Sequence, residues 1–450
     1  MALLANLFCR SSQPVILYWF FLNVLSLAFR TFFRRIYIGN LERIPKGKPI
    51  LLAPNHPNSF IDGILLSVLL RRKLNLLARG DVFKNPLANW ALRSMRVLPI
   101  FRSEDGAGAS QGSKNQLTFD QCHAIFRKKG MVLIFPEGYC VREWRLRPLK
   151  KGAAKMAFEA IEKYPDMDLQ VVPVGLNYSN SGQFREEVCI NFGHPIPISD
   201  YLPLLQKNHQ AKATLQFNER LYEAMEREMV IIDQPANDLI GKHYLIMKRN
   251  QYKSSFFGFI KKSKHRFIVE KRAANDLNDL SKNNQEGFET FRNAITDYFS
   301  TLQNLNVKDK YFSLPLHEKI LYFLFTLIFA IPAFLGFMTN CIPLTFARKM
   351  AKNKVRKIEF FDSVFIGVGA IAWLIYTLII LILCTLIFGA KGIAITIAIR
   401  LLGFVYYFWE EAALNVKYWM VMALSSKGKR MNKSLRNQRL IILNFFETKF

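Results

Sequence analysis

The segment Leu51–Gly63, LLAPNHPNSFIDG, decides how the N-terminal half of this 450-residue chain is interpreted. It opens as an apolar run that ends at Pro54 and Asn55, which is typical of a buried strand. It then continues into FIDGILLSVLLRRK, whose apolar residues have helical spacing. His56 and Asp62 lie at the junction, with five residues between them. The segment therefore predicts a strand, a turn and a helix with two chemically active side chains between strand and helix.

The same alternation of strand and helix continues along the chain. Further strands are predicted at Arg96–Phe101, Gly130–Gly138 and Leu169–Tyr178, and helix-like segments such as KKGAAKMAFEAIEKY lie between them. Alternating strands and helices indicate an α/β domain with a mostly parallel sheet flanked by helices. Polar residues near the ends of parallel strands gather at one edge of the sheet. Four such residues are expected to converge there: His56, Asp62, Arg102 and Glu137.

The charge and the apolar content of the chain point to a membrane. There are 62 Lys and Arg against 34 Asp and Glu, a formal net charge of +28, and aromatic residues make up 14% of the chain. Nucleic acid would explain the charge but not the apolar runs, whereas an anionic lipid surface explains both. No nucleic-acid partner is expected. Val364–Phe388 is an uninterrupted apolar run long enough to span a bilayer, and Ile393–Trp409 is a shorter one.

Composition divides the chain into four predicted segments. They are an N-terminal membrane-associated helix (1–35), an α/β domain (36–234), a polar basic helical linker region (235–312) and a hydrophobic membrane domain with a basic tail (313–450). The apolar stretch Val15–Phe29 reaches only about 22 Å as a helix, short of a bilayer core of roughly 30 Å, so an interfacial helix is expected. The compact loops and the lack of an organelle signal favour a bacterial inner membrane, with the α/β domain facing the cytoplasm.

Four short blocks occur in a fixed order between Leu51 and Gly175. They are the His56–Asp62 block, a strand leading to Arg102, the sequence FPEG (Phe135–Gly138), and VPV (Val172–Val174). This order resembles the phospholipid and glycerol acyltransferase family, which includes lysophosphatidate and glycerol-3-phosphate acyltransferases. The resemblance implies that His56 and Asp62 form the catalytic pair, that Arg102 binds the acceptor phosphate, and that Glu137 and Gly138 belong to the third block.

The chain departs from the family pattern in three of its blocks, and the second block opens with Arg96 where the family normally has glycine. Most members have four residues between the histidine and the aspartate, and the spacing of five resembles the branch with yeast-type glycerol-3-phosphate and dihydroxyacetone-phosphate acyltransferases. The third block usually carries an arginine, but Tyr139, Cys140 and Val141 follow Gly138 here. Basic residues from VREWRLRPLKKG are therefore expected to bind substrate instead: Arg142, Arg145, Arg147, Lys150 or Lys151.

The chemistry of acyl transfer fits these residue types. Removing the proton of an attacking hydroxyl is a task for a neutral histidine whose tautomer is held by a carboxylate, so His56 is the expected base and Asp62 its partner. Arg102 offers a bidentate fork for a phosphate. Ser59 or Cys140 would be the nucleophile of a covalent alternative. The histidines lack metal-ligand spacing, so neither a metal nor another cofactor is expected.

The sequence thus predicts a membrane O-acyltransferase of phospholipid synthesis. The expected donor is acyl-CoA or acyl-carrier protein, and the acceptor is a glycerophosphate or lysophospholipid, with 1-acyl-glycerol 3-phosphate favoured. Glycerol 3-phosphate, dihydroxyacetone phosphate and an aminolipid hydroxyl are alternative acceptors. A lipid-binding membrane scaffold without catalytic activity is the alternative outside the enzyme class.

Overall fold

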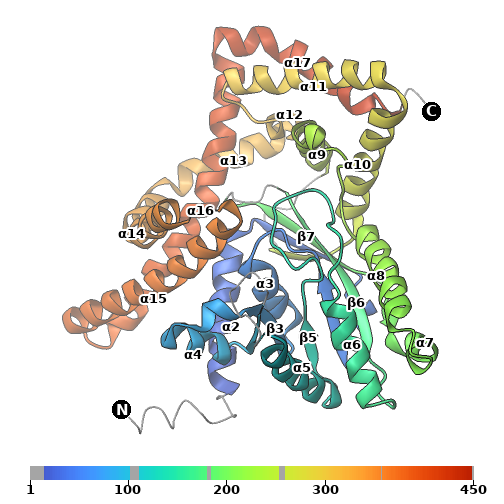
Figure 1. The fold of residues 1–450 in the computed structure, drawn as a ribbon. Helices are drawn as coiled ribbons and strands as arrows, with labels where there is room; N and C mark the ends of the chain where they lie inside the picture. Colours follow the sequence, from blue (N-terminus) through green and yellow to red (C-terminus); the bar gives the residue numbers. More distant parts are fainter. Residues whose placement is uncertain (1–14, 102–110, 180–183, 253–258, 356, 448–450) are drawn as a thin grey trace. The chain divides into compact units, whose positions relative to one another are not determined.

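The computed structural model describes residues 15–101, 111–179, 184–252, 259–355 and 357–447. The chain forms two compact units (Figure 1). The first, here called the sheet unit, consists of Met1–Met229, Phe259–Lys264 and Lys357–Ser363. The second, the helical unit, consists of Val230–Gly258, His265–Arg356 and Val364–Phe450. Two short segments from the C-terminal half of the sequence thus belong to the sheet unit.

The sheet unit is built on one nine-stranded sheet with the order β4-β3-β5-β2-β6-β7-β1-β9, and β8 pairs with β6. The strands are β1 (Arg35–Gly39), β2 (Ile50–Pro54), β3 (Leu74–Arg79), β4 (Val97–Ile100), β5 (Met131–Leu133), β6 (Gln170–Tyr178), β7 (Glu187–Phe192), β8 (Ile196–Pro197) and β9 (Ile260–Lys262). β6 runs antiparallel to β7 and β8, and the other pairs are parallel. The predicted mostly parallel α/β fold is confirmed.

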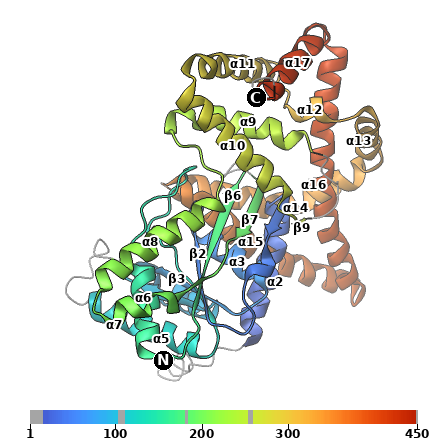
Figure 2. The ribbon, with the colours of Figure 1, turned by 90° about the vertical axis from the view of Figure 1, so that its right-hand side faces the viewer.

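Helices cover both faces of the sheet (Figures 1 and 2). They are α2 (Val15–Phe32), α3 (Phe60–Leu70), α4 (Pro86–Ser94), α5 (Gln111–Arg127), α6 (Gly152–Lys163), α7 (Leu202–Gln206) and α8 (Gln210–Arg227). The chain steps in one direction from β2 to β4 and then reverses towards β5 and β6. Because crossover connections are right-handed, this reversal places α3 and α4 on one face and α5 and α6 on the other. Leu51, Leu65 and Val172 are fully buried between the layers.

One predicted strand is much shorter in the structure, and several strands were not predicted. The strand expected over Gly130–Gly138 is limited to β5, Met131–Leu133. Pro136 has no backbone N–H to donate to a neighbouring strand, and Gly138 has a φ of +75°, so the chain turns there. β1, β3, β7 and β9 lie outside the strands that the sequence predicted.

The helical unit contains nine helices among the residues that the structure describes. They are α9 (Asp238–Asn250), α10 (His265–Asn283), α11 (Gln285–Asn304), α12 (Lys310–Ser313), α13 (Leu316–Ile328), α14 (Ala330–Lys354), α15 (Phe361–Phe388), α16 (Lys391–Leu424) and α17 (Ser426–Asn444). The first residues of α15, up to Ser363, belong to the sheet unit. Figure 2 shows α9, α10, α11 and α17 lying close together, and these helices contact one another.

Three helices are long and apolar enough to cross a membrane. They cover Ala330–Lys354, Ile358–Phe388 and Lys391–Leu424. Large apolar side chains on them face outward, for example Ile371 at 61% and Leu386 at 77% exposure. Such surfaces fit a lipid environment and support membrane association. The predicted short run Ile393–Trp409 is part of α16, a helix of 34 residues, because good helix formers continue the turn pattern past Trp409.

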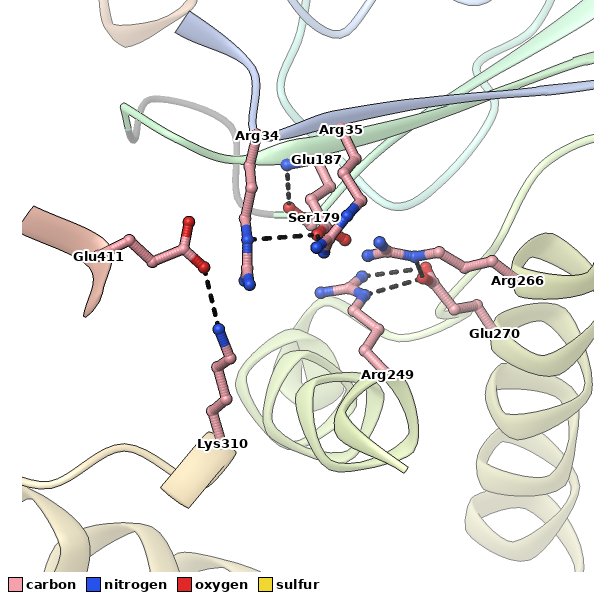
Figure 3. A network of polar contacts seen from close by, with 9 residues as sticks. All are labelled: Arg34, Arg35, Ser179, Glu187, Arg249, Arg266, Glu270, Lys310 and Glu411. Atoms are coloured by element: carbon pink, nitrogen blue, oxygen red, sulfur yellow. Dashed lines mark hydrogen bonds and ion pairs between the residues drawn. The ribbon is translucent and has the colours of Figure 1, made fainter. Parts of the chain in front are cut away.

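A buried ion cluster, here called the arginine clamp, joins α9 to α10 (Figure 3). Glu270, only 3% exposed, accepts hydrogen bonds from Arg249 Nε at 2.9 Å and from Arg266 Nε at 2.6 Å. Burial alone would raise the pKa of Glu270, but the two guanidinium groups outweigh it and hold this pKa at about 2. The clamp is therefore a fully charged link between two helices.

The sheet unit has an ion pair of its own between two neighbouring parallel strands. Arg35 and Glu187 are register partners at the start of β1 and β7, and Arg35 Nη1 lies 3.0 Å from Glu187 Oε1 (Figure 3). The backbone N–H of Glu187 donates to Ser179 Oγ at 2.9 Å. These contacts fix the register at the start of β7.

Candidate active site

The side chain of Asn55 fixes the turn after β2, because it forms two hydrogen bonds with the backbone of β6 as a neighbouring strand would. Asn55 Nδ2 donates to the carbonyl of Leu176 at 3.1 Å, and its Oδ1 accepts from the N–H of Leu176 at 2.7 Å. This pair of hydrogen bonds ties the turn to β6. Ser59, just before α3, has a φ of 48°, which is uncommon for a residue other than glycine. The backbone between β2 and α3 is thus held in one defined shape.

His56 and Asp62 lie within hydrogen-bond distance across this turn. His56 Nδ1 is 2.9 Å from Asp62 Oδ2, and Asp62 is fully buried in the first turn of α3. The imidazole stacks on Phe135, with 3.6 Å between ring centroids and 12° between planes. Because a carboxylate accepts the proton on Nδ1, the neutral ring keeps Nε2 as a free base. The His56 side chain is 13% exposed, which leaves it accessible to a substrate.

Asp62 has two more hydrogen-bond partners that hold it in place. The N–H of Asn58 donates to Oδ2 at 2.8 Å, and the Tyr178 hydroxyl donates to Oδ1 at 2.6 Å. Burial, together with the negative charge of Asp62, raises the pKa of Tyr178 well above its usual value, so the hydroxyl remains a donor. The sequence analysis missed Tyr178. The available signal was a hydroxyl-bearing aromatic residue at the carboxyl end of the strand that contains the VPV block.

Glu137 is buried beside the same turn, and each of its oxygens has a partner in the protein. Oε1 accepts from the N–H of His56 at 2.9 Å, and Oε2 accepts from the N–H of Arg147 at 3.2 Å. Burial raises the pKa of Glu137 to about 7. Its carboxyl group therefore holds the backbone of His56 in this structure. Gly138 has a φ of +75°, and a Cβ there would lie 3.0 Å from Lys150 Cγ.

The basic residues that were expected to bind substrate lie in different surroundings. Arg102 lies outside the described residues. Arg142 Nη2 lies 3.3 Å from Asp362 Oδ2 and 3.2 Å from the carbonyl of Ile358. Lys150 is exposed, with its ammonium 5.1 Å from the centroid of the Tyr139 ring. Lys151 is also exposed and stands at the start of α6.

The two alternative nucleophiles contact each other. The N–H of Ser59 donates to Cys140 Sγ at 3.0 Å. Burial, with the charge of Asp62 adding to it, raises the pKa of the Cys140 thiol and disfavours the thiolate. Among the described residues, no group of three or more His, Cys, Asp and Glu side chains could hold a metal ion.

The part of the chain that holds this site is similar to known proteins. Residues 35–177 match the model of the family described as Acyltransferase. An uncharacterised acyltransferase of Schizosaccharomyces pombe is 23% identical over 296 residues, covering 47% of this chain and 44% of that protein. Glycerol-3-phosphate O-acyltransferase 1 of Saccharomyces cerevisiae is 27% identical over 200 residues, covering 43% and 24%. A chloroplastic 1-acyl-sn-glycerol-3-phosphate acyltransferase of Arabidopsis thaliana is 29% identical over 126 residues, covering 28% and 33%.

Over residues 35–177 the chain thus resembles the acyltransferase family, as its motif blocks led us to expect. The matched segment contains the whole turn from β2 to α3 together with Glu137, and it ends one residue before Tyr178. This chain spans less than half the length of each of the three relatives.

Proposed function

We propose that the protein is a membrane O-acyltransferase that moves a fatty acyl group from a thioester to a hydroxyl of a glycerophosphate acceptor. The observation that carries the proposal is the His56–Asp62 hydrogen bond across a largely buried turn, in a sheet unit that has the family's motif blocks. The buried carboxylate holds the proton on Nδ1, so Nε2 is the basic atom that an acceptor hydroxyl can reach.

The reaction needs no covalent enzyme intermediate. His56 Nε2 takes the hydroxyl proton while the acceptor oxygen forms a bond to the thioester carbonyl carbon. The tetrahedral intermediate then expels the thiolate, which receives that proton from the imidazolium, so an ester and a free thiol are formed. Asp62 stabilises the imidazolium between the two steps, and Asn58 N–H and Tyr178 hold Asp62. The raised pKa of the Cys140 thiol speaks against a covalent route through that residue.

Exposed cations near the site are suited to the acceptor phosphate and to the phosphates of acyl-CoA or acyl-carrier protein. Lys150 and Lys151 are exposed and stand where α6 begins, so their charge adds to the positive end of that helix. Arg102 remains our proposed partner for the acceptor phosphate on the strength of the family's second block. Arg142 is held by Asp362 in this structure and is the less available cation.

Two acceptors are supported by different observations. Glycerol 3-phosphate is favoured by the spacing of five residues between His56 and Asp62 and by the longer match to the yeast enzyme of that name. 1-Acyl-glycerol 3-phosphate, which the sequence analysis favoured, is supported by the plant relative and by the helices that could hold the protein beside a lipid acceptor. For the location we keep the proposal of a bacterial inner membrane with the sheet unit on the cytoplasmic side.

A direct assay tests the proposal. Full-length protein in detergent or liposomes is supplied with radiolabelled acyl-CoA or acyl-carrier protein and, separately, with glycerol 3-phosphate, dihydroxyacetone phosphate, 1-acyl-glycerol 3-phosphate or an aminolipid. We expect acylation of a glycerophosphate by the wild type and a loss of at least about 10³-fold in His56→Ala. His209→Ala, an exposed histidine, is the matched control and is expected to keep full activity.

Two outcomes would contradict the proposal. No acyl transfer to any acceptor by the wild type would favour a lipid-binding scaffold. Full activity of His56→Ala, with normal membrane insertion, would remove the base assignment.

A further inference from the structure

The segment Lys357–Ser363 belongs to the sheet unit although it lies far from the acyltransferase blocks in the sequence. It contains Asp362, which stands in the first turn of α15 and is fully buried. Residues 35–177 alone match the family, so this segment lies outside the matched region. A buried carboxylate costs free energy unless it is paired and hydrogen-bonded, which raises the question of what Asp362 holds.

Asp362 contacts both halves of the candidate site. Its Oδ2 accepts from Asn58 Nδ2 at 3.1 Å and lies 3.3 Å from Arg142 Nη2. Asn58 comes from the turn after β2, and Arg142 comes from the stretch after the third motif block. One oxygen atom from the C-terminal half of the chain thus links two parts of the site.

Asn58 connects Asp362 to the His56–Asp62 pair by hydrogen bonds. The side chain of Asn58 is bound to Asp362, and its backbone N–H donates to Asp62 Oδ2 at 2.8 Å, the same oxygen that faces His56 Nδ1. Asn58 is fully buried. Fixing its side chain therefore limits how far this peptide can move away from Asp62, and the peptide in turn limits the position of the imidazole.

Further contacts from the same segment support this arrangement. Arg142 Nη2 also lies 3.2 Å from the carbonyl of Ile358, and Phe360 packs near Phe60 with 6.4 Å between ring centroids. Phe60 is the first residue of α3, two positions before Asp62. The segment therefore touches the start of the helix that carries Asp62 as well as the turn before it.

Resting on the function proposed above, we propose that Asp362 is a positioning residue for acyl transfer. It holds Asn58 so that the N–H of Asn58 stays on Asp62, and it holds Arg142 in a fixed place at the same time. The site is thus completed by the beginning of α15, a helix that is long and apolar enough to span a membrane. Asp362 itself does not touch the reacting atoms.

The test compares three variants of the full-length protein in the acylation assay. Asp362→Ala removes both contacts and is expected to lower kcat by about 10- to 100-fold, with the KM for the acyl donor within twofold of the wild type. Asp362→Asn keeps an oxygen for Asn58 Nδ2 but loses the charge that faces Arg142, so its kcat should stay within about threefold. Glu359→Gln removes a carboxylate from the same segment and is the control, with kcat expected to be unchanged.

A double-mutant cycle separates positioning from a general loss of structure. If Asp362 acts through Asn58, Asp362→Ala should cost less than threefold in kcat when Asn58 is already alanine. Additive losses in the double variant would overturn the proposal, as would a kcat for Asp362→Ala within twofold of Glu359→Gln. Should Asp362→Ala fail to accumulate in membranes, Asp362→Glu replaces it: kcat reduced at least fivefold supports the proposal, and an unchanged kcat overturns it.

These experiments distinguish a wrong positioning role for Asp362 from a wrong proposed function. Absence of acyl transfer by the wild-type protein would contradict the function itself. Acyl transfer that is lost in His56→Ala but indifferent to Asp362 and Asn58 would contradict only the positioning role.

Discussion

Two buried glutamates, one in each unit, have opposite ionisation behaviour. Glu137 in the sheet unit is bound by two backbone N–H groups, and burial raises its pKa to about 7. Glu270 in the helical unit is bound by two arginines, which outweigh burial and hold its pKa at about 2. The same residue type at similar burial therefore serves two purposes: Glu137 shapes the candidate active site, and Glu270 holds two helices together.

This comparison predicts that substitutions around Glu137 change activity, whereas substitutions in the arginine clamp change stability. The site network comprises His56, Asp62, Glu137 and Tyr178, and the clamp comprises Arg249, Glu270 and Arg266.

Asp62→Asn should lower kcat by about 10³-fold with little change in stability. The amide would donate to Nδ1 of His56, which places the ring proton on Nε2 and removes the base. Steady-state kinetics with the preferred acceptor measure the effect. Asp81→Asn, an aspartate paired with Arg79 at the surface, is the control and should keep its activity. A loss below tenfold would contradict the assigned role of Asp62.

Glu270→Ala should destabilise the protein by about 3 kcal/mol, because it leaves two guanidinium groups without their buried partner. Thermal unfolding in detergent measures the change. Glu289→Ala, which removes an exposed ion pair with Arg292, is the matched control and should shift stability by about 0.5 kcal/mol or less. Equal melting temperatures for the two variants would mean that the clamp does not stabilise the helical unit.

Tyr178→Phe should lower kcat by about tenfold, because Asp62 loses one of its three hydrogen-bond donors while the ring still fills its place. The KM values should change by less than twofold. Tyr201→Phe, another buried tyrosine of the sheet unit, is the control. An unchanged kcat in Tyr178→Phe would show that the other two donors suffice to hold Asp62.

The two glutamates should give opposite slopes of stability against pH. Between pH 4.5 and about 7 the native state binds more protons at Glu137 than the unfolded state does, so the free energy of unfolding falls as pH rises through this range. For Glu270 the native state binds fewer protons between pH 4.5 and about 2, so the stability it contributes is lost as pH falls through this range.

Melting curves of wild type, Glu137→Gln and Glu270→Gln across these pH ranges measure both slopes. Glu137→Gln should flatten the dependence between pH 4.5 and 7, and Glu270→Gln should flatten it below pH 4.5. If stability depends on pH between pH 4.5 and 7 in the same way in Glu137→Gln and in the wild type, the Glu137 carboxyl group does not titrate in this range. The contrast with Glu270 would then be wrong.

The sequence was sufficient for features that depend on neighbouring residues. The strand, turn and helix around His56 follow from local apolar spacing, and the mostly parallel sheet follows from the alternation of such units. The apolar helices were predictable because their length and composition are local properties. The edge strand β9 and its neighbour β1 were missed, because they are short and their pairing partners are remote in sequence.

Only the tertiary structure decided which side chains meet at the site. Tyr178 reaches Asp62 across 116 positions of sequence, Glu137 reaches the N–H of His56 across 81, and Asp362 reaches Asn58 across 304. Hydrogen bonds depend on atomic positions within a few tenths of an ångström, and no local pattern specifies such positions between distant segments. The sequence by itself thus predicted the kind of chemistry and determined the class of fold. Folding determined the partners that hold His56 and Asp62, because packing of the sheet is what brings those segments together.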